Sequence, residues 1–261
     1  MKLAQLMENQ LSPEATNHLK RIGSDFSTND DGSIDIRGNF TAYDDLPEGF
    51  PKINRVHGDY TMEESYNGSS LNLNLIPAHV DGNCVMHVPE TIAASQLPVS
   101  TNGKGDLIIS GADQLFLDDD KMFNYKTTKL DIQCTGDLSF LPRQLTTSAL
   151  RIHNTIENIP PVLHVEALLM SFDDPENMMK GFHKRFTDVS AKTVILFCNE
   201  NTPLLGLFKI KGMTALNIMY TGIGPAKTLN NILSNAIQGD GDIFTVQEAL
   251  IDAGYTKHAK R

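Results

Sequence analysis

The stretch GSIDIRGNF, residues 32–40, decides how the rest of the chain is interpreted. Ile34 and Ile36 alternate with Asp35 and Arg37, which is the period of a half-buried β-strand, and the strand leads into a Gly-Asn pair. The same pattern, two apolar residues alternating with polar ones near a Gly-Asp or Gly-Asn pair, returns along the chain. It recurs as HGDYTM (57–62), SLNLNLIP (70–77), GNCVMHVP (82–89), GDLIIS (105–110), KLDIQC (129–134), ALRIHN (149–154), ALLMSF (167–172), TVILFC (193–198) and ALNIMY (215–220).

These stretches start roughly 20 residues apart, a period typical of a solenoid whose repeats cannot bury their apolar faces alone. Between many of them an apolar residue precedes proline, as in LPEGFP (46–51) and IPP (159–161). Proline cannot donate to a strand ladder and favours extended backbone before it. We therefore expect each repeat to be a short strand, a turn, an extended return and a second turn. The apolar pairs should point inward, namely Ile34/Ile36, Leu130/Ile132 and Leu150/Ile152.

The fold class that follows is an α/β repeat solenoid, a leucine-rich-repeat-like curved stack of roughly nine short parallel strands with helical caps. We expect one domain over residues 1–261. It divides into a helical N-terminal cap at 1–24, strand–loop repeats over 25–220 and a helical C-terminal cap at 221–261.

The caps carry recognisable helix signals. Ser12-Pro13 combines a capping residue with proline at the first helical position. Near the other end Pro225, after the Gly-rich turn TGIG (221–224), is expected to begin a helix. Thr245 with Glu248 three residues later predicts a capping box for a last helix that stops at Gly254.

Composition narrows the class of partner and the compartment. With 22 basic and 32 acidic residues the net charge is −10, which argues against a nucleic-acid backbone as the main partner. Cys84, Cys134 and Cys198 are odd in number, widely spaced and set in apolar runs, which predicts buried thiols in a reducing compartment. No apolar window approaches the ~18 residues of a membrane span, and the N-terminus lacks the apolar run of a secretory signal. We therefore expect a cytoplasmic protein with no membrane partner.

The acidic stretch before the first strand resembles a calcium-binding loop only in part. If Gly32 is the invariant sixth residue, the twelve-residue frame runs from Ser27 to Gly38. Ser27 then replaces a carboxylate at the first position, and Gly38 replaces the bidentate glutamate at the twelfth. Losing both end ligands removes most of the charge that holds the ion, so we predict an Asp/Gly turn that feeds a strand.

Other stretches that could carry chemistry do not form a known motif. HVDGNCVMH (79–87) lacks zinc-ligand spacing, and strand alternation sends Cys84 and His87 to opposite faces. No cysteine stands at a helix start or in a Gly-rich context that would lower its pKa. We therefore predict no catalytic residues, no metal and no cofactor, and hence a protein that is not an enzyme.

The strand face is the candidate binding surface, because stacking aligns its outward residues into one array. A merely solvated sheet face is the equal alternative. The candidate partner-binding residues are Asp35, Asp59, Asn72, Asn74, Asp131, Gln133, Arg151 and His153.

A second candidate surface is the basic cluster in MMKGFHKRF (178–186), which consists of Lys180, His183, Lys184 and Arg185. One interpretation is contact with RNA, an acidic partner or a phosphate. The other, which we favour, is an insertion in which the Phe and Met side chains pack inward while the basic ends stay in water.

The later strands break the polar alternation, since Leu169, Ile195 and Phe197 stand where polar residues are expected. Strands without alternation are usually covered on both faces. Either the C-terminal module folds over them or they form an apolar patch that recognises a partner. We predict the first.

FPKINRVHGDYTM (50–62) resembles the repeat of leucine-rich-repeat-like proteins of tailed bacteriophages, and the run from LLGLFKIKGMTALNIM (204–219) to GDIFTVQEALIDAGYTKHAKR (241–261) is similar to their C-terminal module. The resemblance implies a phage-encoded repeat protein without a transferable catalytic motif. We expect a non-enzymatic protein–protein interaction scaffold in the cytoplasm of the infected bacterium, binding or inhibiting a host defence protein. The alternative is a virion-associated component of the capsid or tail, whose partner is a phage structural protein. The oligomeric state is open.

Overall fold

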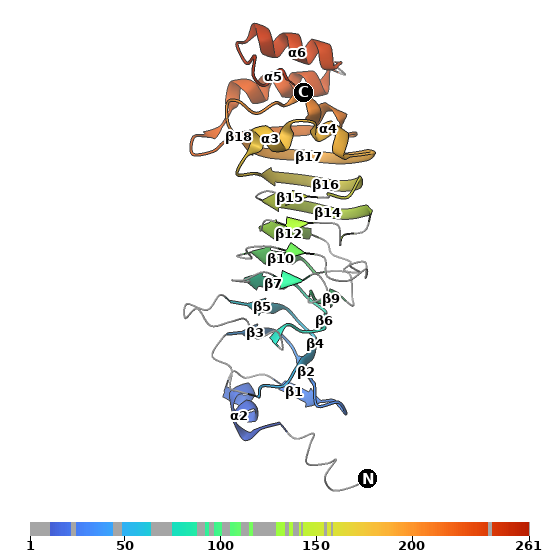
Figure 1. Ribbon diagram of the computed structural model, residues 1–261, viewed down its shortest axis with the longest axis vertical. Helices are drawn as coiled ribbons and strands as arrows, with labels where there is room; N and C mark the ends of the chain where they lie inside the picture. Colours follow the sequence, from blue (N-terminus) through green and yellow to red (C-terminus); the bar gives the residue numbers. More distant parts are fainter. Residues whose placement is uncertain are drawn as a thin grey trace. The chain divides into compact units, whose positions relative to one another are not determined.

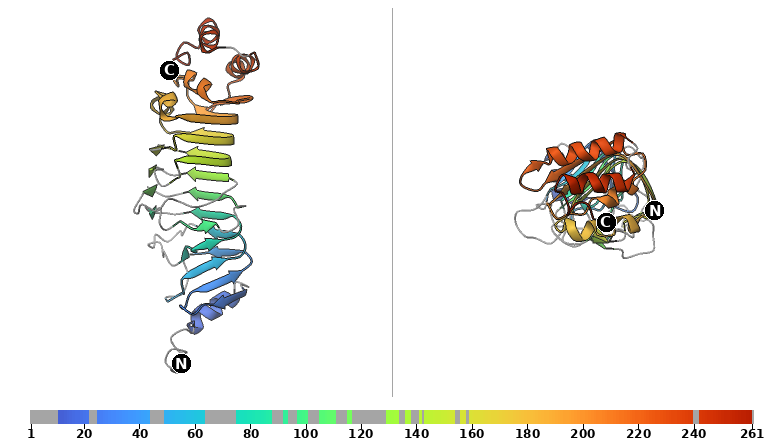
Figure 2. Two further views of the ribbon diagram at one scale, coloured as in Figure 1. Left: turned by 90° about the vertical axis from the view of Figure 1, so that its right-hand side faces the viewer. Right: turned by 90° about the horizontal axis from the view of Figure 1, so that it is seen from above.

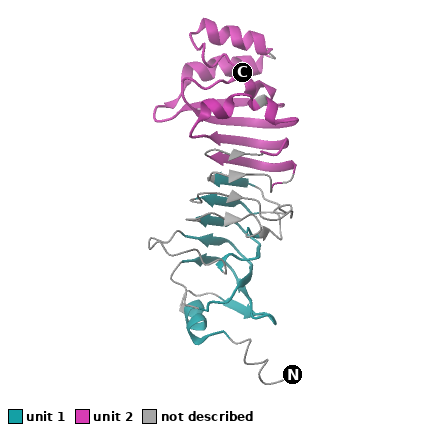
Figure 3. Ribbon diagram, in the orientation of Figure 1, with its two compact units in different colours: residues 1–134 teal, residues 135–261 magenta. Residues whose placement is uncertain are grey.

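In the computed structural model the strands run largely parallel and stack as rungs of a β-solenoid, with helices near both ends (Figure 1). The chain forms two compact units, residues 1–134 and 135–261 (Figure 3). The predicted fold class, a repeat solenoid of parallel strands with helical caps, is confirmed. The structure describes residues 11–21, 25–43, 49–63, 75–87, 92–93, 97–100, 105–110, 115–116, 129–133, 136–137, 141, 143–153, 156–157, 159–239 and 242–260.

The N-terminal unit begins with helix α2 (Pro13–Arg21), where the Ser12 hydroxyl accepts a hydrogen bond from the Ala15 amide at 3.0 Å, as its capping role requires. A hairpin then pairs β1 (Asp25–Thr28) antiparallel with β2 (Ile34–Arg37). In its turn the Asp31 carboxylate accepts from the Ser33 amide at 3.0 Å, and Gly32 has a φ of 82°. The acidic stretch is thus a turn that feeds a strand, as predicted.

Two sheets of mainly parallel strands follow in this unit. Four successive turns of the chain each contribute one strand to both sheets, and β12 extends the second sheet. The first has the order β1-β2-β4-β6-β9 and the second the order β3-β5-β7-β10-β12. The new strands of the first sheet are β4 (Ile53–Val56), β6 (His79–Val80) and β9 (Val99–Ser100). Those of the second are β3 (Phe40–Ala42), β5 (Tyr60–Met62), β7 (Cys84–His87), β10 (Leu107–Ser110) and β12 (Lys129–Gln133). On the return path β8 (Ile92–Ala93) pairs with β11 (Leu115–Phe116).

This arrangement corrects the single series of rungs expected from the sequence. Ile34 and Ile36 lie in the first sheet, whereas Leu130 and Ile132 lie in the second. All four are buried, so the inward direction of the apolar pairs is confirmed. The expectation of one strand per repeat was wrong, because the turns from β2 to β10 each contain a strand of the first sheet, a corner and a strand of the second sheet.

The corner between the two sheets is held by a ladder of Asn and Asp side chains. Asn39 Oδ1 accepts from the Asp59 amide at 2.9 Å, and Asp59 Oδ1 accepts from the Asn83 amide at 2.8 Å. Asn83 Oδ1 in turn accepts from the Asp106 amide at 3.0 Å. Each side chain therefore satisfies a backbone donor of the next rung, where the corner interrupts the strand ladder.

At the corners after the first, the glycines Gly58, Gly82 and Gly105 are required by the close approach of successive corners. A Cβ on Gly58 would lie 2.6 Å from the carbonyl carbon of Gly38, and a Cβ on Gly105 would lie 1.9 Å from the carbonyl oxygen of Gly82. The Gly-Asn and Gly-Asp pairs are therefore steric and hydrogen-bonding parts of the stack.

The C-terminal unit has longer parallel strands. They are β14 (Gln144–His153), β16 (Val162–Ser171), β17 (Asp188–Cys198) and β18 (Ala215–Tyr220), with β19 (Gly224–Pro225) antiparallel to β18. The return strands β13 (Gly136–Asp137) and β15 (Ile156–Glu157) pair with each other. The sequence predicted only the second half of β14, β16 and β17. Their first halves also alternate, with Leu145, Leu163 and Val189 buried in one row.

An insertion and two helices complete this unit. Short helices α3 (Pro175–Met179) and α4 (Phe182–Arg185) stand between β16 and β17, and the 3₁₀ helix η4 (Leu205–Lys209) follows β17. Helices α5 (Lys227–Gln238) and α6 (Ile243–Asp252) lie beyond β18 at the end of the sheet (Figures 1 and 2). None of the helices in the described ranges is long and apolar enough to span a membrane.

Two of the predicted helix starts are corrected. Pro225 belongs to β19, and α5 begins at Lys227. The last helix begins after Asp242, whose carboxylate accepts from the Phe244 and Thr245 amides at 2.7 and 2.9 Å. A carboxylate at this position caps more strongly than the proposed Thr245 box, and so it sets the start of the helix. The predicted stop is confirmed, since Gly254 has a φ of 83°.

Candidate functional site

The predicted strand-face residues that the structure describes differ in their exposure and in their hydrogen bonds. Asp35 faces outward and accepts side-chain hydrogen bonds from Asn29 at 3.0 Å and Asn54 at 2.7 Å. Asp59 lies at the corner, where its carboxylate belongs to the ladder described above. Arg151 and His153 face outward from β14 and are half-buried.

Asp131 requires a correction. It is 1% exposed, between the buried Leu130 and Ile132, so both faces of β12 are covered at this point and its carboxylate cannot meet a partner. Gln133 ends the same strand. Asn72 and Asn74 lie outside the described residues.

In the insertion that carries the basic cluster, the Phe side chains pack inward and the charged ends lie in water, as the sequence predicts. Phe182 and Phe186 are buried, with ring centroids 4.9 Å apart at an interplanar angle of 61°. Lys184 and Arg185 are exposed, and His183 stands between them and Phe182 in α4. The apolar residues therefore anchor the insertion, and the charged ends remain in water.

The outward face of the long strands in the C-terminal unit carries an apolar patch, which we call the outer patch and define by Leu169, Ile195, Phe197 and Met219. Leu169 pairs with Ile195, and Phe197 pairs with Met219, so these side chains stand side by side on neighbouring strands. Leu169, Ile195 and Phe197 alternate with buried residues, and Met219 follows the buried Ile218. All four are themselves half-buried. Their apolar surface is therefore partly open to solvent.

The rows beside the outer patch shape its border. One neighbouring row holds only small side chains, which leaves a flat shelf on the sheet; its members are Ala149, Ala167, Thr193 and Ala215. In the row of Leu169 and Ile195 the ends are polar, with Arg151 on one side and Asn217 on the other. An apolar centre with a polar rim is the usual anatomy of a protein–protein interface.

The C-terminal helices cover the edge of this sheet rather than its outward face. Asn230 of α5 accepts from the Ile218 amide at 2.6 Å and donates to the Ile218 carbonyl at 3.0 Å, and so pairs with open backbone groups of β18. α5 packs on β18, while α6 packs on α5 and η4. The C-terminal module therefore packs on the last strand, β18, at an edge that would otherwise pair with another strand, and Leu169, Ile195 and Phe197 of β16 and β17 stay half-buried rather than fully buried.

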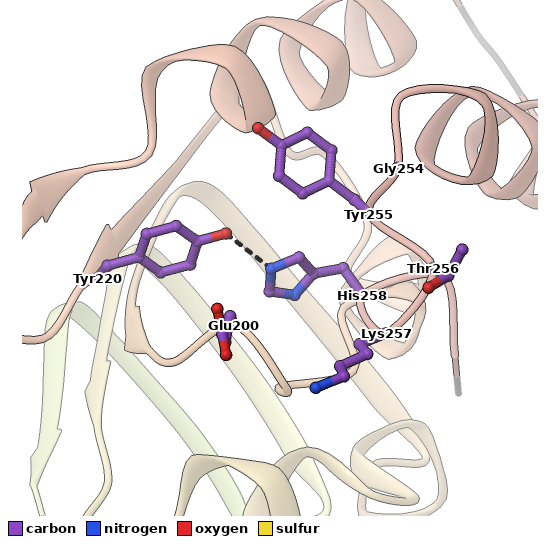
Figure 4. Close-up of a pocket in the computed structure, with 7 residues that line it drawn as sticks. All are labelled: Glu200, Tyr220, Gly254, Tyr255, Thr256, Lys257 and His258. Carbon is purple, nitrogen blue, oxygen red and sulfur yellow. Dashed lines mark hydrogen bonds between the residues drawn. The ribbon is translucent and has the colours of Figure 1, made fainter.

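Sequence reasoning missed the segment after α6, of which residues 254–258 line a cavity of about 370 Å³ (Figure 4). The Tyr220 hydroxyl faces the imidazole of His258 at 2.8 Å, and the two rings lie within 14° of parallel. Tyr255, Glu200 and Lys257 stand around them. His258 is buried, and it ties this segment to the sheet.

The hydrogen bonds of His258 determine its protonation. Nδ1 lies 2.7 Å from the Thr202 carbonyl, which can only accept, so Nδ1 carries a proton and donates it. Burial lowers the pKa of His258, against the opposing effects of the Thr202 bond and Glu200. The imidazole is therefore neutral, and its Nε2 accepts from Tyr220. Burial also raises the pKa of Tyr220 to about 12, so the phenol stays protonated and the pair acts as a clamp.

This clamp predicts a specific dependence of stability on pH. Above the ordinary imidazole pKa of about 6.5, His258 is neutral in both the folded and the unfolded chain. Below it the unfolded chain binds a proton that the folded chain resists, so stability falls by at most about 1.4 kcal/mol per pH unit. We expect the melting temperature to fall more between pH 7.5 and 5.5 in the wild type than in His258→Asn, which keeps a donor for Thr202. Parallel pH profiles of the two proteins would contradict this.

The described cysteines are buried, and Asp81 and His87 of the stretch 79–87 have side-chain partners. Burial raises the pKa of the Cys84 thiol, and it raises the pKa of Cys198 to about 12, which disfavours the thiolate that a nucleophile requires.

Asp81 accepts from Arg55 at 2.8 Å and lies 3.0 Å from His57, while His87 lies 2.5 Å from the Ser110 hydroxyl. Within the described ranges, no three His, Cys, Asp or Glu side chains gather into a metal-binding group. Cys134 lies outside those ranges.

Comparison of the chain with family models, with curated proteins and with solved structures finds no match.

Proposed function

We propose that this protein is a non-enzymatic scaffold that binds another protein through the outer patch. The observation that carries the proposal is the cluster of half-buried apolar side chains, Leu169, Ile195, Phe197 and Met219, on the outward face of β16, β17 and β18, while α5 packs on β18 and α6 packs on α5 and η4. Burying such a cluster against a partner is favourable by about 25 cal/mol for each Å² of apolar surface removed from water. The rigid parallel sheet holds the patch in place before binding, which limits the entropy lost on association.

The partner fits the chemistry of the patch if it presents apolar side chains to the centre and polar groups to the rim. The flat shelf of Ala149, Ala167, Thr193 and Ala215 admits the backbone or side chains of an approaching element without a steric barrier. The resemblance to phage repeat proteins, best over about residues 33–62 and 204–258, supports a phage-encoded scaffold whose partner is a protein of the infected bacterium. In this role inhibition of a host defence protein would follow from occupation of that protein's own surface.

Affinity capture from phage-infected cells tests the proposal with three baits. Wild-type bait should recover one host protein, and Ile195→Glu should recover at least tenfold less of it, because a carboxylate at the centre of the patch must be desolvated without a partner. Thr146→Glu introduces the same charge at an exposed position in the first half of β14 and should recover the wild-type amount. Melting temperatures close to that of the wild type would show that both variants are folded.

Two results would contradict the proposal. Equal recovery by the wild-type and Ile195→Glu baits would exclude the outer patch as the contact surface. Recovery of phage structural proteins alone, in amounts that match the particle, would replace a host partner with a place in the virion.

A further inference from the structure

A second cavity in the C-terminal unit, of about 350 Å³, is lined mainly by lysines. Its lining residues come from α3 and the turn after it, from the loop after β17 and from the last described segment. They are Glu176, Lys180, Asn201, Pro203, Lys257 and Lys260. In a chain whose net charge is −10, a cavity with three ammonium groups and one carboxylate is unusual.

Only one of these lysines has a carboxylate partner in the cavity. Lys180 forms an ion pair with Glu176 at 3.4 Å. The Lys257 ammonium donates to the neutral amide oxygen of Asn201. Lys260 has no ion pair within the described part of the chain. Within the described residues, the Lys257 and Lys260 ammonium groups therefore form no ion pair with a carboxylate.

The backbone that carries Lys257 and Lys260 is fixed before any ligand arrives. The Leu204 amide donates to the His258 carbonyl at 3.0 Å, and the Leu205 amide donates to the Lys260 carbonyl at 3.3 Å. Gln247 also donates to the Ala259 carbonyl at 2.9 Å, and His258 and Ala259 are buried. The anchored segment therefore holds both lysines beside the loop after β17, at little entropic cost to a ligand.

We propose that this cavity binds an oxyanion of the phosphate class, a function beyond the binding of a protein at the outer patch. A phosphate or phosphate monoester carries nearly two negative charges at neutral pH, which matches the Lys257 and Lys260 ammonium groups. Its oxygens accept several charge-assisted hydrogen bonds at once, and lysine is a common phosphate ligand. Lys257 also lines the cavity of Tyr220 and Tyr255, so the organic part of a monoester would lie on the aromatic side.

Isothermal titration with inorganic phosphate, at low and constant ionic strength, tests this site in the full chain. We expect a dissociation constant on the order of 1 mM, typical of a few charge-assisted contacts. Lys257→Gln and Lys260→Gln should each weaken binding at least fivefold. Lys227→Gln removes an exposed lysine of α5 that does not line the cavity and should bind like the wild type. Unchanged circular dichroism would show that the variants are folded.

A parallel titration with phenyl phosphate distinguishes the source of the oxyanion. Affinity at least threefold higher than for inorganic phosphate identifies an organic monoester whose ring enters the aromatic cavity. Equal affinity identifies the free ion, and either result supports the oxyanion site. No binding of either probe up to about 50-fold above the expected dissociation constant would overturn the proposal. Equal weakening by Lys227→Gln would also overturn it, because the attraction would then be that of the whole surface. Neither result would bear on the outer patch.

Discussion

Gly105→Ala should destabilise the protein by about 3 kcal/mol or more, which is the upper end of the cost of overpacking. The new Cβ would lie 1.9 Å from the carbonyl oxygen of Gly82, and this contact cannot be relieved by turning a side chain. The two rungs would have to separate at the corner, which would also lengthen the bond from the Asp106 amide to Asn83. Urea unfolding followed by circular dichroism measures the loss.

Gly38→Ala is the matched control, because Gly38 opens the same series of corners but has no earlier corner beneath it. A Cβ there meets nothing within 4 Å. Its φ of 87° is strained for alanine, which costs about 1–2 kcal/mol. An equal loss in the two variants would contradict the steric account of the Gly-Asx corners.

Phe182→Ala should cost about 3–5 kcal/mol, the usual range for a buried phenylalanine. Phe182 is 2% exposed and packs edge-on against Phe186, so its removal leaves a cavity under the insertion between β16 and β17. Thermal and urea unfolding of the variant would show the loss.

The exposed neighbour Lys184 provides the comparison. Lys184→Ala should change stability by no more than about 0.5 kcal/mol, because its side chain lies in water. If Lys184→Ala were as destabilising as Phe182→Ala, the division of this insertion into buried anchors and solvated charges would be wrong.

The sequence was sufficient to predict a stack of parallel strands, but not how many strands each turn of the solenoid contains. Alternation placed Ile34, Ile36, Leu150 and Ile152 correctly in the core, because a period of two leaves only one choice of face. The strands β6 and β9 have two residues each, too few to show a period, so the sequence pattern did not predict these two strands of the first sheet.

The candidate site was harder to predict because its parts meet only after folding. Leu169, Ile195 and Phe197 break the alternation in the sequence, but only the structure shows that α5 packs on β18, that α6 packs on α5 and η4, and that the outer-patch side chains are half-buried. His258 is hydrogen-bonded to Thr202, which lies 56 residues earlier in the sequence, and no local sequence motif predicts that contact. The nearest signal was the segment TKHAKR (256–261), where a central histidine stands among basic residues.

Site-specific crosslinking in infected cells tests the central claim most directly, namely that the outer patch is the contact surface for a protein partner. A photo-crosslinking residue replaces Thr193 in one protein and Asn217 in another, both beside the patch, and Thr146 in a control. We predict that positions 193 and 217 crosslink to the same host protein and that position 146 does not. Crosslinking to that protein from position 146 alone, or to none from the two positions beside the patch, would contradict the account.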